Sequence, residues 1–274
     1  MWAAPKCSMA FAPLNSPDSC FSILPRAMMA DSVVLLRHPR GTPDPYEHAL
    51  AGEGATVQCT PVLAFDIDPP PTLSVLLNRA AAYGALVCTS PRAVQALRQA
   101  LPPDHPLYAA WANKPTYVVG PRTAGAVSEW GGQPTGAEAG DAAALADRIV
   151  ADAPGRLLFL SGNRRRDTLP RALVEAGQVF DEVEVYRTRL RSNITLPDPP
   201  AWLAFFSPSG IEAVRASGYA LDAYACAAIG STTAAALRDE GASVQAVAAS
   251  PTPDALAAAI RDVQASGQSR PSSP

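Results

Sequence analysis

The residues in this chain that could do chemistry are mostly hydroxyl side chains and arginines placed just after short apolar runs. Ser90 follows the apolar residues 86–88, and Ser207 follows residues 203–206. Each serine stands where a helix takes an N-cap, and the proline after it suits the first helical position because no N–H is needed there. Unpaired N–H groups at such a helix start attract anions. These turns therefore predict an anion-binding site, with ordinary capped turns as the alternative.

The chain contains this pattern twice. Residues 86–127 and residues 202–237 each hold an apolar run ending in Ser-Pro, a helix-like segment, a second apolar run ending in glycine and a threonine-bearing helix start. Two copies of a long unit predict two similar lobes rather than a solenoid. The candidate ligand-binding residues, at these turns and after the apolar run 156–160, are Ser90, Pro91, Arg92, Thr123, Gly162, Asn163, Ser207, Ser209, Gly210, Thr232 and Thr233.

Arginines are concentrated around the same turns. One group comprises Arg164, Arg165, Arg166, Arg171, Arg187, Arg189 and Arg191, while Arg92 and Arg122 follow the turns of the first copy. A guanidinium group can fork around a carboxylate or a phosphate. The alternative is a solvated surface paired with Asp167 and Glu184. Because the formal net charge is -3, the grouping indicates a local anion site rather than affinity for nucleic acid.

Tyr186 is the candidate proton donor. It lies in the extended segment 179–190, and a phenol can donate a proton or a hydrogen bond to a departing hydroxyl group. A tyrosine in a strand is also commonly a packing residue. The chain has no GxGxxG, no GxxxxGK[ST] and no GxSxG, so the dinucleotide-binding, P-loop and α/β-hydrolase interpretations lose their mechanism.

Composition narrows the class of protein further. With 274 residues, 48% hydrophobic and 17% charged, the chain is typical of a globular protein of one large or two ordinary domains. Its apolar stretches are shorter than the roughly 20 residues of a membrane span. The 5 cysteines show no CxxC spacing and predict reduced thiols in the cytoplasm, and the 3 histidines predict no metal site.

The order of the predicted strands favours a discontinuous first lobe. We expect an α/β fold with two doubly wound, mostly parallel five-stranded lobes joined by a two-stranded ribbon hinge. Residues 31–62 and 190–264 form lobe one, residues 66–186 form lobe two, and segments 60–67 and 184–191 pair as the ribbon. Residues 1–30 are predicted to be a disordered extension and residues 265–274 a disordered tail.

Several helix starts can be predicted from capping patterns. Thr42-Pro43 is expected to cap a short helix that ends near Gly52, and Asp141 to cap an alanine-rich helix. A basic helix is expected from Arg164, after the strand 156–160 and the turn residues Ser161, Gly162 and Asn163. Residues 252–254 are expected to begin the last helix, which gives way to the polar tail near Gln264.

A set of motifs in fixed order resembles the uroporphyrinogen-III synthase family. They are CTSPRAV at 88–94, VVGPRTA at 118–124, SGNRRRDTLPRAL at 161–173, VEVYRT at 183–188, FFSPSGIEAV at 205–214, AIGSTTAAAL at 228–237 and PTPDALAAAI at 251–260. The resemblance extends from about residue 33 to residue 260. It does not include the first thirty residues.

This resemblance implies a fold, a reaction and a site. The family has two α/β lobes with the first built from both ends of the chain, uses no metal and no cofactor, and acts as a cyclising hydro-lyase in tetrapyrrole biosynthesis. Its substrate is hydroxymethylbilane, whose eight carboxylates are held in a cleft largely by main-chain N–H groups at strand-to-helix turns. Ring D is inverted as water is lost, giving uroporphyrinogen III. The family tyrosine maps to Tyr186.

The resemblance also implies a cytoplasmic monomer without membrane or nucleic-acid partners, in transient contact with hydroxymethylbilane synthase. Whether haem, sirohaem, cobalamin or chlorophyll is the end product stays open. The alternative function is a non-catalytic two-lobed binding protein that closes on a small polyanion. The two functions differ in turnover, because a binding protein would leave hydroxymethylbilane to cyclise spontaneously to the type I isomer.

Overall fold

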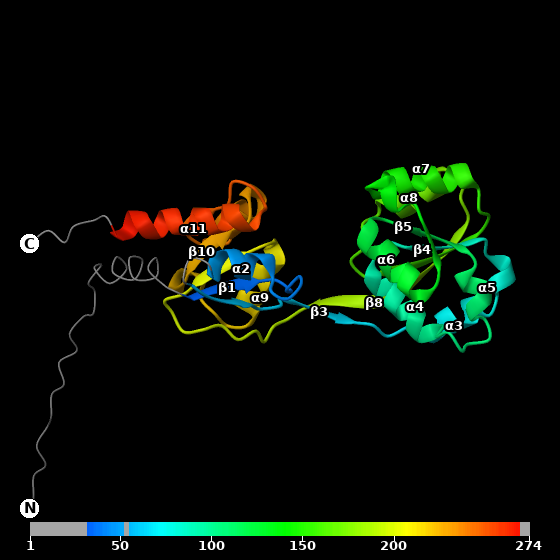
Figure 1. Ribbon diagram of the computed structural model, residues 1–274, viewed down its shortest axis with the longest axis horizontal. Helices are drawn as coiled ribbons and strands as arrows, with labels where there is room; N and C mark the ends of the chain where they lie inside the picture. Colours follow the sequence, from blue (N-terminus) through cyan, green and yellow to red (C-terminus); the bar gives the residue numbers. More distant parts are fainter. Residues whose placement is uncertain (1–31, 52–54, 269–274) are drawn as a thin grey trace, which may run out of the picture. The chain divides into compact units, whose positions relative to one another are not determined.

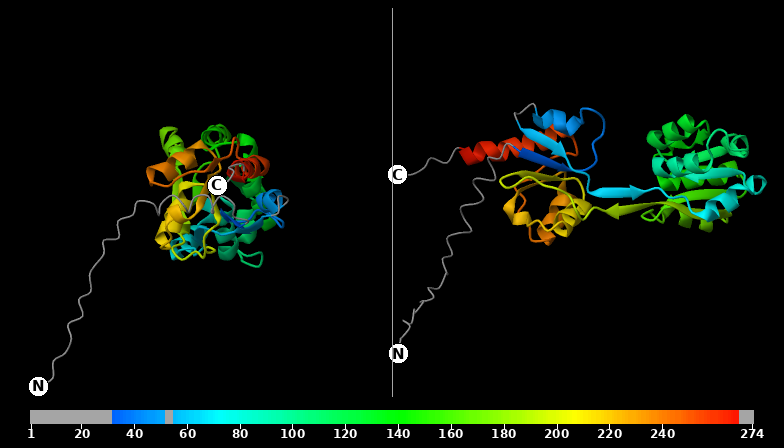
Figure 2. Two further views of the ribbon diagram at one scale, coloured as in Figure 1. Left: turned by 90° about the vertical axis from the view of Figure 1, so that its left-hand side faces the viewer. Right: turned by 90° about the horizontal axis from the view of Figure 1, so that it is seen from below.

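The computed structural model describes residues 32–51 and 55–268, which form two compact units. Unit one contains the described residues up to Leu63 and from Leu190, and unit two spans residues 64–189. The extension predicted for residues 1–30 and residues 269–274 of the predicted tail lie outside the described residues. Figure 1 and Figure 2 show the elements of each unit.

Unit one is built on a parallel five-stranded sheet in the order β11-β10-β9-β1-β2. The strands are β1 (Ser32–Leu36), β2 (Thr56–Cys59), β9 (Trp202–Phe205), β10 (Ala225–Ala228) and β11 (Ala246–Val247). The N-terminal strands β1 and β2 thus pair with β9 from the far end of the sequence. They belong to a different sheet from the one that contains Val87.

Helices cover both faces of this sheet. Helices α2 (Pro45–Ala51) and α11 (Pro253–Gln268) lie on one face, and α9 (Pro208–Ala216) and α10 (Ser231–Asp239) on the other (Figure 1). A short 3₁₀ turn, η4 (Leu221–Ala223), precedes β10. Alternation along β1 supplies both cores: Val33 and Leu35 pack with α2 and α11, while Val34 and Leu36 pack with α9 and α10. Burial on both faces explains the unbroken apolar runs.

Unit two contains a six-stranded sheet in the order β3-β8-β7-β4-β5-β6. The strands are β3 (Leu63–Asp66), β4 (Ala85–Cys88), β5 (Pro115–Val118), β6 (Gln133–Thr135), β7 (Leu157–Gly162) and β8 (Phe180–Leu190). The pairs from β8 to β6 are parallel, whereas the arrows of β3 and β8 point in opposite directions in Figure 2. The prediction of five strands was wrong because β3 is bonded to β8 and extends this sheet.

The helices of unit two also lie on both faces of its sheet. Helices α3 (Pro71–Leu77), α4 (Pro91–Ala100), α5 (Tyr108–Ala112) and α6 (Pro121–Trp130) cover one face, and α7 (Ala142–Asp152) and α8 (Thr168–Glu175) the other (Figure 1). Two 3₁₀ turns, η2 (Ala80–Ala82) and η3 (Ala137–Ala139), complete the unit. Asp141 caps α7 as predicted, accepting hydrogen bonds from the N–H groups of Ala143 and Ala144 at 2.9 Å.

Two predicted helix boundaries were wrong. Helix α8 begins at Thr168 rather than at Arg164, because Pro170 lacks an N–H and is tolerated only in the first turn. Helix α11 extends to Gln268, four residues beyond Gln264, because Ala265 is a good helix former and the sequence has no helix-breaking proline between Gln264 and Gln268. The residues predicted to begin the polar tail are therefore helical.

The start of α2 was also misplaced. The helix begins at Pro45, preceded by Asp44, and not at the predicted Thr42-Pro43. The Asp44 carboxylate accepts a hydrogen bond from the Tyr46 N–H at 2.9 Å, which is the contact of a capping residue. Asp44 is fully buried, so its position is fixed more firmly than that of the exposed Thr42.

Candidate active site

The candidate residues lie where strands of each unit end and helices begin. In unit two, β4 leads into α4 and its neighbour β5 leads into α6; in unit one, β9 leads into α9 and its neighbour β10 into α10. Carboxyl ends of adjacent parallel strands meet at one edge of a sheet, where α/β folds bind ligands. The topology therefore brings Ser90, Pro91 and Arg92 to the same edge as Thr123. In unit one it brings Ser207, Ser209 and Gly210 to the same edge as Thr232 and Thr233.

The helix starts differ in how they are capped. Ser90 caps α4 as predicted, its hydroxyl accepting a hydrogen bond from the Arg92 N–H at 3.2 Å. Ser207 stands at the N-cap of α9, but its hydroxyl lies 2.7 Å from the hydroxyl of Ser209 and does not cap the helix. Glycines, Gly120 and Gly230, precede α6 and α10 and provide no side-chain cap. Three of these four helix starts thus leave N–H groups available to an anion.

The third residue of each helix start faces the sheet. Thr123 in α6 and Thr233 in α10 are 3% and 5% exposed, respectively. Gly210 holds the equivalent position in α9, where an added Cβ would lie 3.2 Å from the ring of Phe205. Thr232, one residue before Thr233, is exposed at the edge. Among the predicted unit-one residues, the exposed Thr232 therefore reaches solvent more readily than Thr233 or Gly210.

Tyr186 lies at a β-bulge in β8. The register with β7 pairs Ser161 with Glu184 but Gly162 with Tyr186, so Val185 is an extra residue on β8. Bulges bend a strand and re-aim its side chains. The Tyr186 ring packs against Gly162 so closely that a Cβ at Gly162 would lie 2.2 Å from the ring atom Cζ. Only a glycine at residue 162 leaves room for the ring. The Tyr186 side chain is half-buried and lies at the carboxyl end of β7.

Asn163 holds β8 just beyond the bulge. Its side-chain Nδ2 donates to the Thr188 carbonyl at 3.3 Å, its Oδ1 accepts from the Thr188 N–H at 2.8 Å, and its own N–H donates to the Tyr186 carbonyl at 3.3 Å. The side-chain amide of Asn163 thus bonds both the N–H and the carbonyl of Thr188, as a neighbouring strand would. These contacts fix the backbone that carries Tyr186.

Four of the seven grouped arginines are paired with acids within unit two. Arg165 pairs with Glu182 and Asp167, Arg189 with Asp66, Arg187 with Glu184 at 2.6 Å and Arg171 with Glu175 at 3.8 Å. The solvated, paired alternative therefore describes these four. Arg92 is different: its guanidinium lies 3.3 Å from the centre of the Phe65 ring. Burial lowers its pKa, the phenol of Tyr186 raises it, and the charge of Arg122 lowers it.

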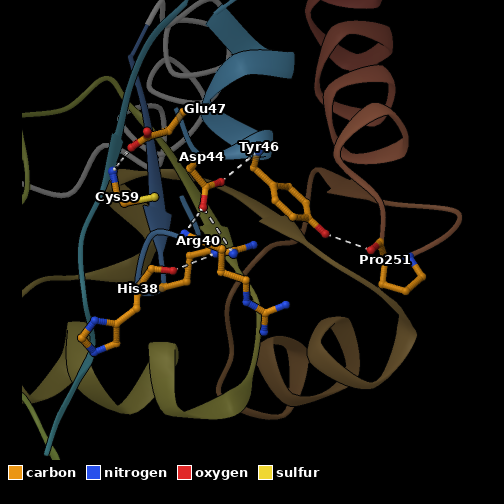
Figure 3. A network of polar contacts seen from close by, with 8 residues as sticks. His38, Arg40, Asp44, Tyr46, Glu47, Cys59 and Pro251 are labelled. Atoms are coloured by element: carbon orange, nitrogen blue, oxygen red, sulfur yellow. Dashed lines mark hydrogen bonds and ion pairs between the residues drawn. The ribbon is translucent and has the colours of Figure 1, made fainter. Parts of the chain in front are cut away.

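In unit one a buried ion pair organises the loop after β1 (Figure 3). Asp44 lies 3.4 Å from the guanidinium of Arg37 and accepts a hydrogen bond from the Arg40 N–H at 2.6 Å. The Arg37 guanidinium lies against two rings that contact each other edge to face, 4.7 Å from the centre of Tyr46 and 4.8 Å from that of Phe206. Phe206 immediately precedes Ser207, so this cluster also positions the start of α9. Tyr46 reaches across to the Pro251 carbonyl at 2.8 Å.

Thiolate chemistry is unfavourable at the described cysteines. The pKa of each of the thiols of Cys59, Cys88 and Cys226 is raised to about 12, and burial is the largest cause of each increase. Protonated thiols are poor nucleophiles and poor metal ligands. Among residues 32–51 and 55–268 there is no cluster of three or more metal-ligating side chains, and no helix there has the length and apolarity to cross a membrane.

A family model described as uroporphyrinogen-III synthase HemD matches residues 44–258 of the chain. The chain belongs to the uroporphyrinogen-III synthase family. The matched segment contains every candidate site residue described above, Tyr186 included, and it spans both units.

Individual relatives agree with this family. A uroporphyrinogen-III synthase of Saccharomyces cerevisiae is 34% identical over 128 residues, which are 42% of this chain and 46% of the yeast protein. The alignment thus spans less than half of that relative. The crystal structure of uroporphyrinogen-III synthetase from Helicobacter pylori matches with a TM-score of 0.58 and 21% identity, covering 86% of this chain and 98% of that one. That similarity shows a shared HemD-like fold.

A mutant uroporphyrinogen III synthase from Thermus thermophilus matches with a TM-score of 0.48 and 19% identity, over 86% of this chain and 99% of its own.

Sequence reasoning missed the residues that support the site. Asp44-Pro45 is a helix-start signal equal to Thr42-Pro43, and it could have located the buried Asp44. Phe65 and the bulge at Val185 had no such signal, because each depends on strand register. The stacking of Arg92 on Phe65 joins residues 27 positions apart, counted from the sequence numbers.

Proposed function

We propose that this member of the family is itself a uroporphyrinogen-III synthase. It would convert hydroxymethylbilane to uroporphyrinogen III with loss of one water and inversion of ring D. The observation that carries the proposal is the placement of Tyr186, held by a bulge over Gly162 at the carboxyl end of β7 within the family match. The yeast relative's name supports the same activity.

The chemistry asks for one proton donor and many anion contacts. The O–H of Tyr186 donates a proton to the terminal hydroxyl of the bilane, which leaves as water and gives an azafulvene. The substituted carbon of ring D then attacks the azafulvene methylene carbon and gives a spiro intermediate. Its original bond to the methylene bridge from ring C breaks, and that bridge closes on the other α-carbon, so that ring D is inverted. The proton lost when the ring regains aromaticity balances the one that Tyr186 supplied. Among the described residues, the Tyr186 hydroxyl has no hydrogen-bond partner, so it is available for this role.

Substrate carboxylates would bind at the helix starts. In unit two these are the first turns of α4 and α6, with Ser90, Pro91, Arg92 and Thr123, together with Gly162 and Asn163 after β7. In unit one they are the first turns of α9 and α10, with Ser207, Ser209, Gly210, Thr232 and Thr233. Main-chain N–H groups carry most of this binding, because helix starts lacking a side-chain cap offer several donors and a favourable dipole. No metal or cofactor is needed for water loss from such an activated alcohol.

The decisive experiment is product analysis. Hydroxymethylbilane is generated enzymatically and offered to the purified chain, the reaction is stopped with oxidant, and the type I and type III uroporphyrins are separated by chromatography. We expect type III to dominate. Type I alone, at the spontaneous rate, would overturn the proposal and favour a polyanion-binding protein.

We further propose that β3 and β8 act as a hinge. Their pairing and the division of the chain near Leu63 and Leu190 support this, since both crossings of the chain occur on neighbouring strands. Within unit two the pair is strengthened by the ion pair of Arg189 with Asp66. Small-angle scattering with and without uroporphyrin III tests the hinge: a smaller radius of gyration with ligand is expected, and an unchanged radius contradicts it.

We also propose that the protein works in the cytoplasm as a monomer and receives substrate in transient contact with hydroxymethylbilane synthase. The cysteines of the described residues, Cys59, Cys88 and Cys226, carry free thiols, which is compatible with a reducing compartment. The instability of hydroxymethylbilane favours rapid transfer. Size-exclusion chromatography with light scattering checks the oligomeric state, and a mass of twice the chain would contradict it.

A further inference from the structure

Two arginines without acidic partners line one cavity in unit two. The cavity has a volume of about 430 Å³ and is bounded by Pro91, Arg92, Gln95, Arg122 and Thr123. Among the described residues, neither guanidinium has a carboxylate partner. By contrast Arg98, two turns along the same helix as Arg92, lies 3.9 Å from Glu129. The two cations face a common space and repel one another, as the effect of Arg122 on the pKa of Arg92 shows.

Phe65 holds one of these cations in place. The Arg92 guanidinium stacks on its ring with 3.3 Å between the central carbon and the ring centre. A guanidinium stacked on a ring keeps its N–H groups in its own plane, parallel to the ring, where its edge can fork around a carboxylate. Phe65 belongs to β3 at the edge of the sheet, so it reaches Arg92 from a different element than the one that carries the arginine.

We propose that Arg92 and Arg122 form a subsite for one carboxylate of the ligand, and that Phe65 is the positioning residue that holds Arg92 over it. The inference rests on the proposed function in that the carboxylate would be a side chain of the tetrapyrrole. A bound carboxylate would neutralise the repulsion between two otherwise unpartnered cations. The phenol of Tyr186 raises the pKa of Arg92, which supports a subsite near the proton donor. The subsite therefore fixes the bilane relative to Tyr186.

The first experiment measures binding and turnover of charge-matched variants. Arg92→Gln, Arg122→Gln and the double variant are compared with Arg98→Gln, which removes the same charge from α4 away from the cavity. Uroporphyrin III binding is titrated by fluorescence quenching at low and high salt, and KM and kcat are measured with hydroxymethylbilane. We expect Kd and KM to rise about ten- to hundredfold for each cavity variant, with a weaker salt dependence of binding. Variants that behave like Arg98→Gln overturn the subsite.

The second experiment isolates Phe65. Phe65→Leu removes the stacking surface, whereas Phe65→Trp keeps an aromatic ring and should retain near wild-type binding. The leucine change is made in the wild-type and in the Arg92→Gln background, with circular dichroism and thermal melting as checks on folding. We expect Phe65→Leu to raise KM several-fold only when Arg92 is present. An equal effect in both backgrounds, or none in either, means that Phe65 does not act through Arg92.

The outcomes of these experiments distinguish failure of the subsite from failure of the proposed function. A wild-type chain that makes type III product, with cavity variants equal to the control, sinks the subsite and leaves the function standing. A wild-type chain that makes only type I product sinks the function, and the uroporphyrin III titration still tests the subsite by itself. Wild-type protein that fails to bind uroporphyrin III overturns the subsite.

Discussion

Unit one and unit two place different side chains on the same strand-turn-helix scaffold. At the second position of corresponding helices, unit two has Arg92 in α4 and Arg122 in α6, whereas unit one has Ser209 in α9 and Thr232 in α10. The scaffold supplies main-chain N–H groups in both units. The second residue then decides whether positive charge or only a hydroxyl group is added to that edge. The side chain at this second position of each helix therefore sets the chemistry of the edge.

Arginine itself has two roles in this comparison. Arg37 in unit one stacks on aromatic rings as Arg92 does, but it lies beside the buried carboxylate of Asp44 and its side chain is only 10% exposed. A buried cation beside a carboxylate has little charge left for a ligand, and removing one partner alone is costly. We therefore regard Arg37 as structural, and Arg92 as the arginine free to bind an anion.

The largest effect is expected from Tyr186→Phe. Loss of a general acid lowers a rate by roughly a hundredfold or more, whereas binding of the substrate carboxylates would be unchanged. We expect kcat to fall by that factor, KM to stay near its wild-type value and type III to remain the product. Stopped reactions analysed by chromatography give both the rate and the isomer. Full wild-type turnover would remove Tyr186 from the mechanism. Turnover would then depend on the strand-turn-helix scaffold, which both units have, and not on a side chain of unit two.

The next largest effect is expected from Gly162→Ala. A Cβ there would lie 2.2 Å from the Tyr186 ring, so the ring must move. Misplacing a catalytic group by about an ångström costs up to a hundredfold, and we expect a fall in kcat of roughly ten- to hundredfold. Gly125→Ala is the matched control: it is exposed in α6 with no atom within 4 Å of the added Cβ, and it should stabilise the helix by up to about 1 kcal/mol. Equal activity of both variants would contradict the placement of Tyr186.

How much of this site can be predicted from sequence follows from the range of each interaction. Local signals located the turns: Ser90-Pro91 and Asp141 are caps set by their own neighbours, and both were confirmed. The start of α8 was also determined locally by Pro170, although the run of arginines obscured it. What could not be predicted depends on pairing between distant segments. Strand β3 joins the sheet through β8, and Phe65 reaches Arg92 only in that register.

A smaller effect is expected from Thr232→Trp, which tests whether unit one binds through its main chain. Thr232 is exposed at the second position of α10, and a bulky ring there would keep a carboxylate away from the N–H groups. Loss of one charge-assisted contact should raise KM about tenfold with little change in kcat. Asp239→Trp, at the far end of the same helix, serves as the control. A fall in kcat at unchanged KM would mean that unit one contributes to the chemical step.

The smallest effect concerns stability, and it contrasts two buried tyrosines. The Tyr83 hydroxyl in unit two donates to the carboxylate of Asp181 at 2.5 Å, whereas Tyr224 in unit one donates to the Pro197 carbonyl at 3.0 Å. Hydrogen bonds from Arg156, and then from Tyr83, hold the pKa of Asp181 at about 2. A carboxyl whose pKa is lower in the folded state stabilises above the ordinary value near 4, and this contribution is lost as pH falls toward about 2.

We therefore expect unit two to lose stability between about pH 4 and about pH 2 through Asp181, while the Tyr224 bond in unit one does not titrate. Because Asp181 is partly exposed, its replacement by asparagine should cost only about 1 kcal/mol at neutral pH. The same change should flatten the acid dependence. Hydrogen exchange of β4, which follows Tyr83, is measured from pH 7 to pH 2 in the wild type and in Asp181→Asn, with β10 as the internal reference. An unaltered pH dependence in the variant would mean that other carboxylates, such as Asp152 beside Arg148, govern the acid stability of unit two.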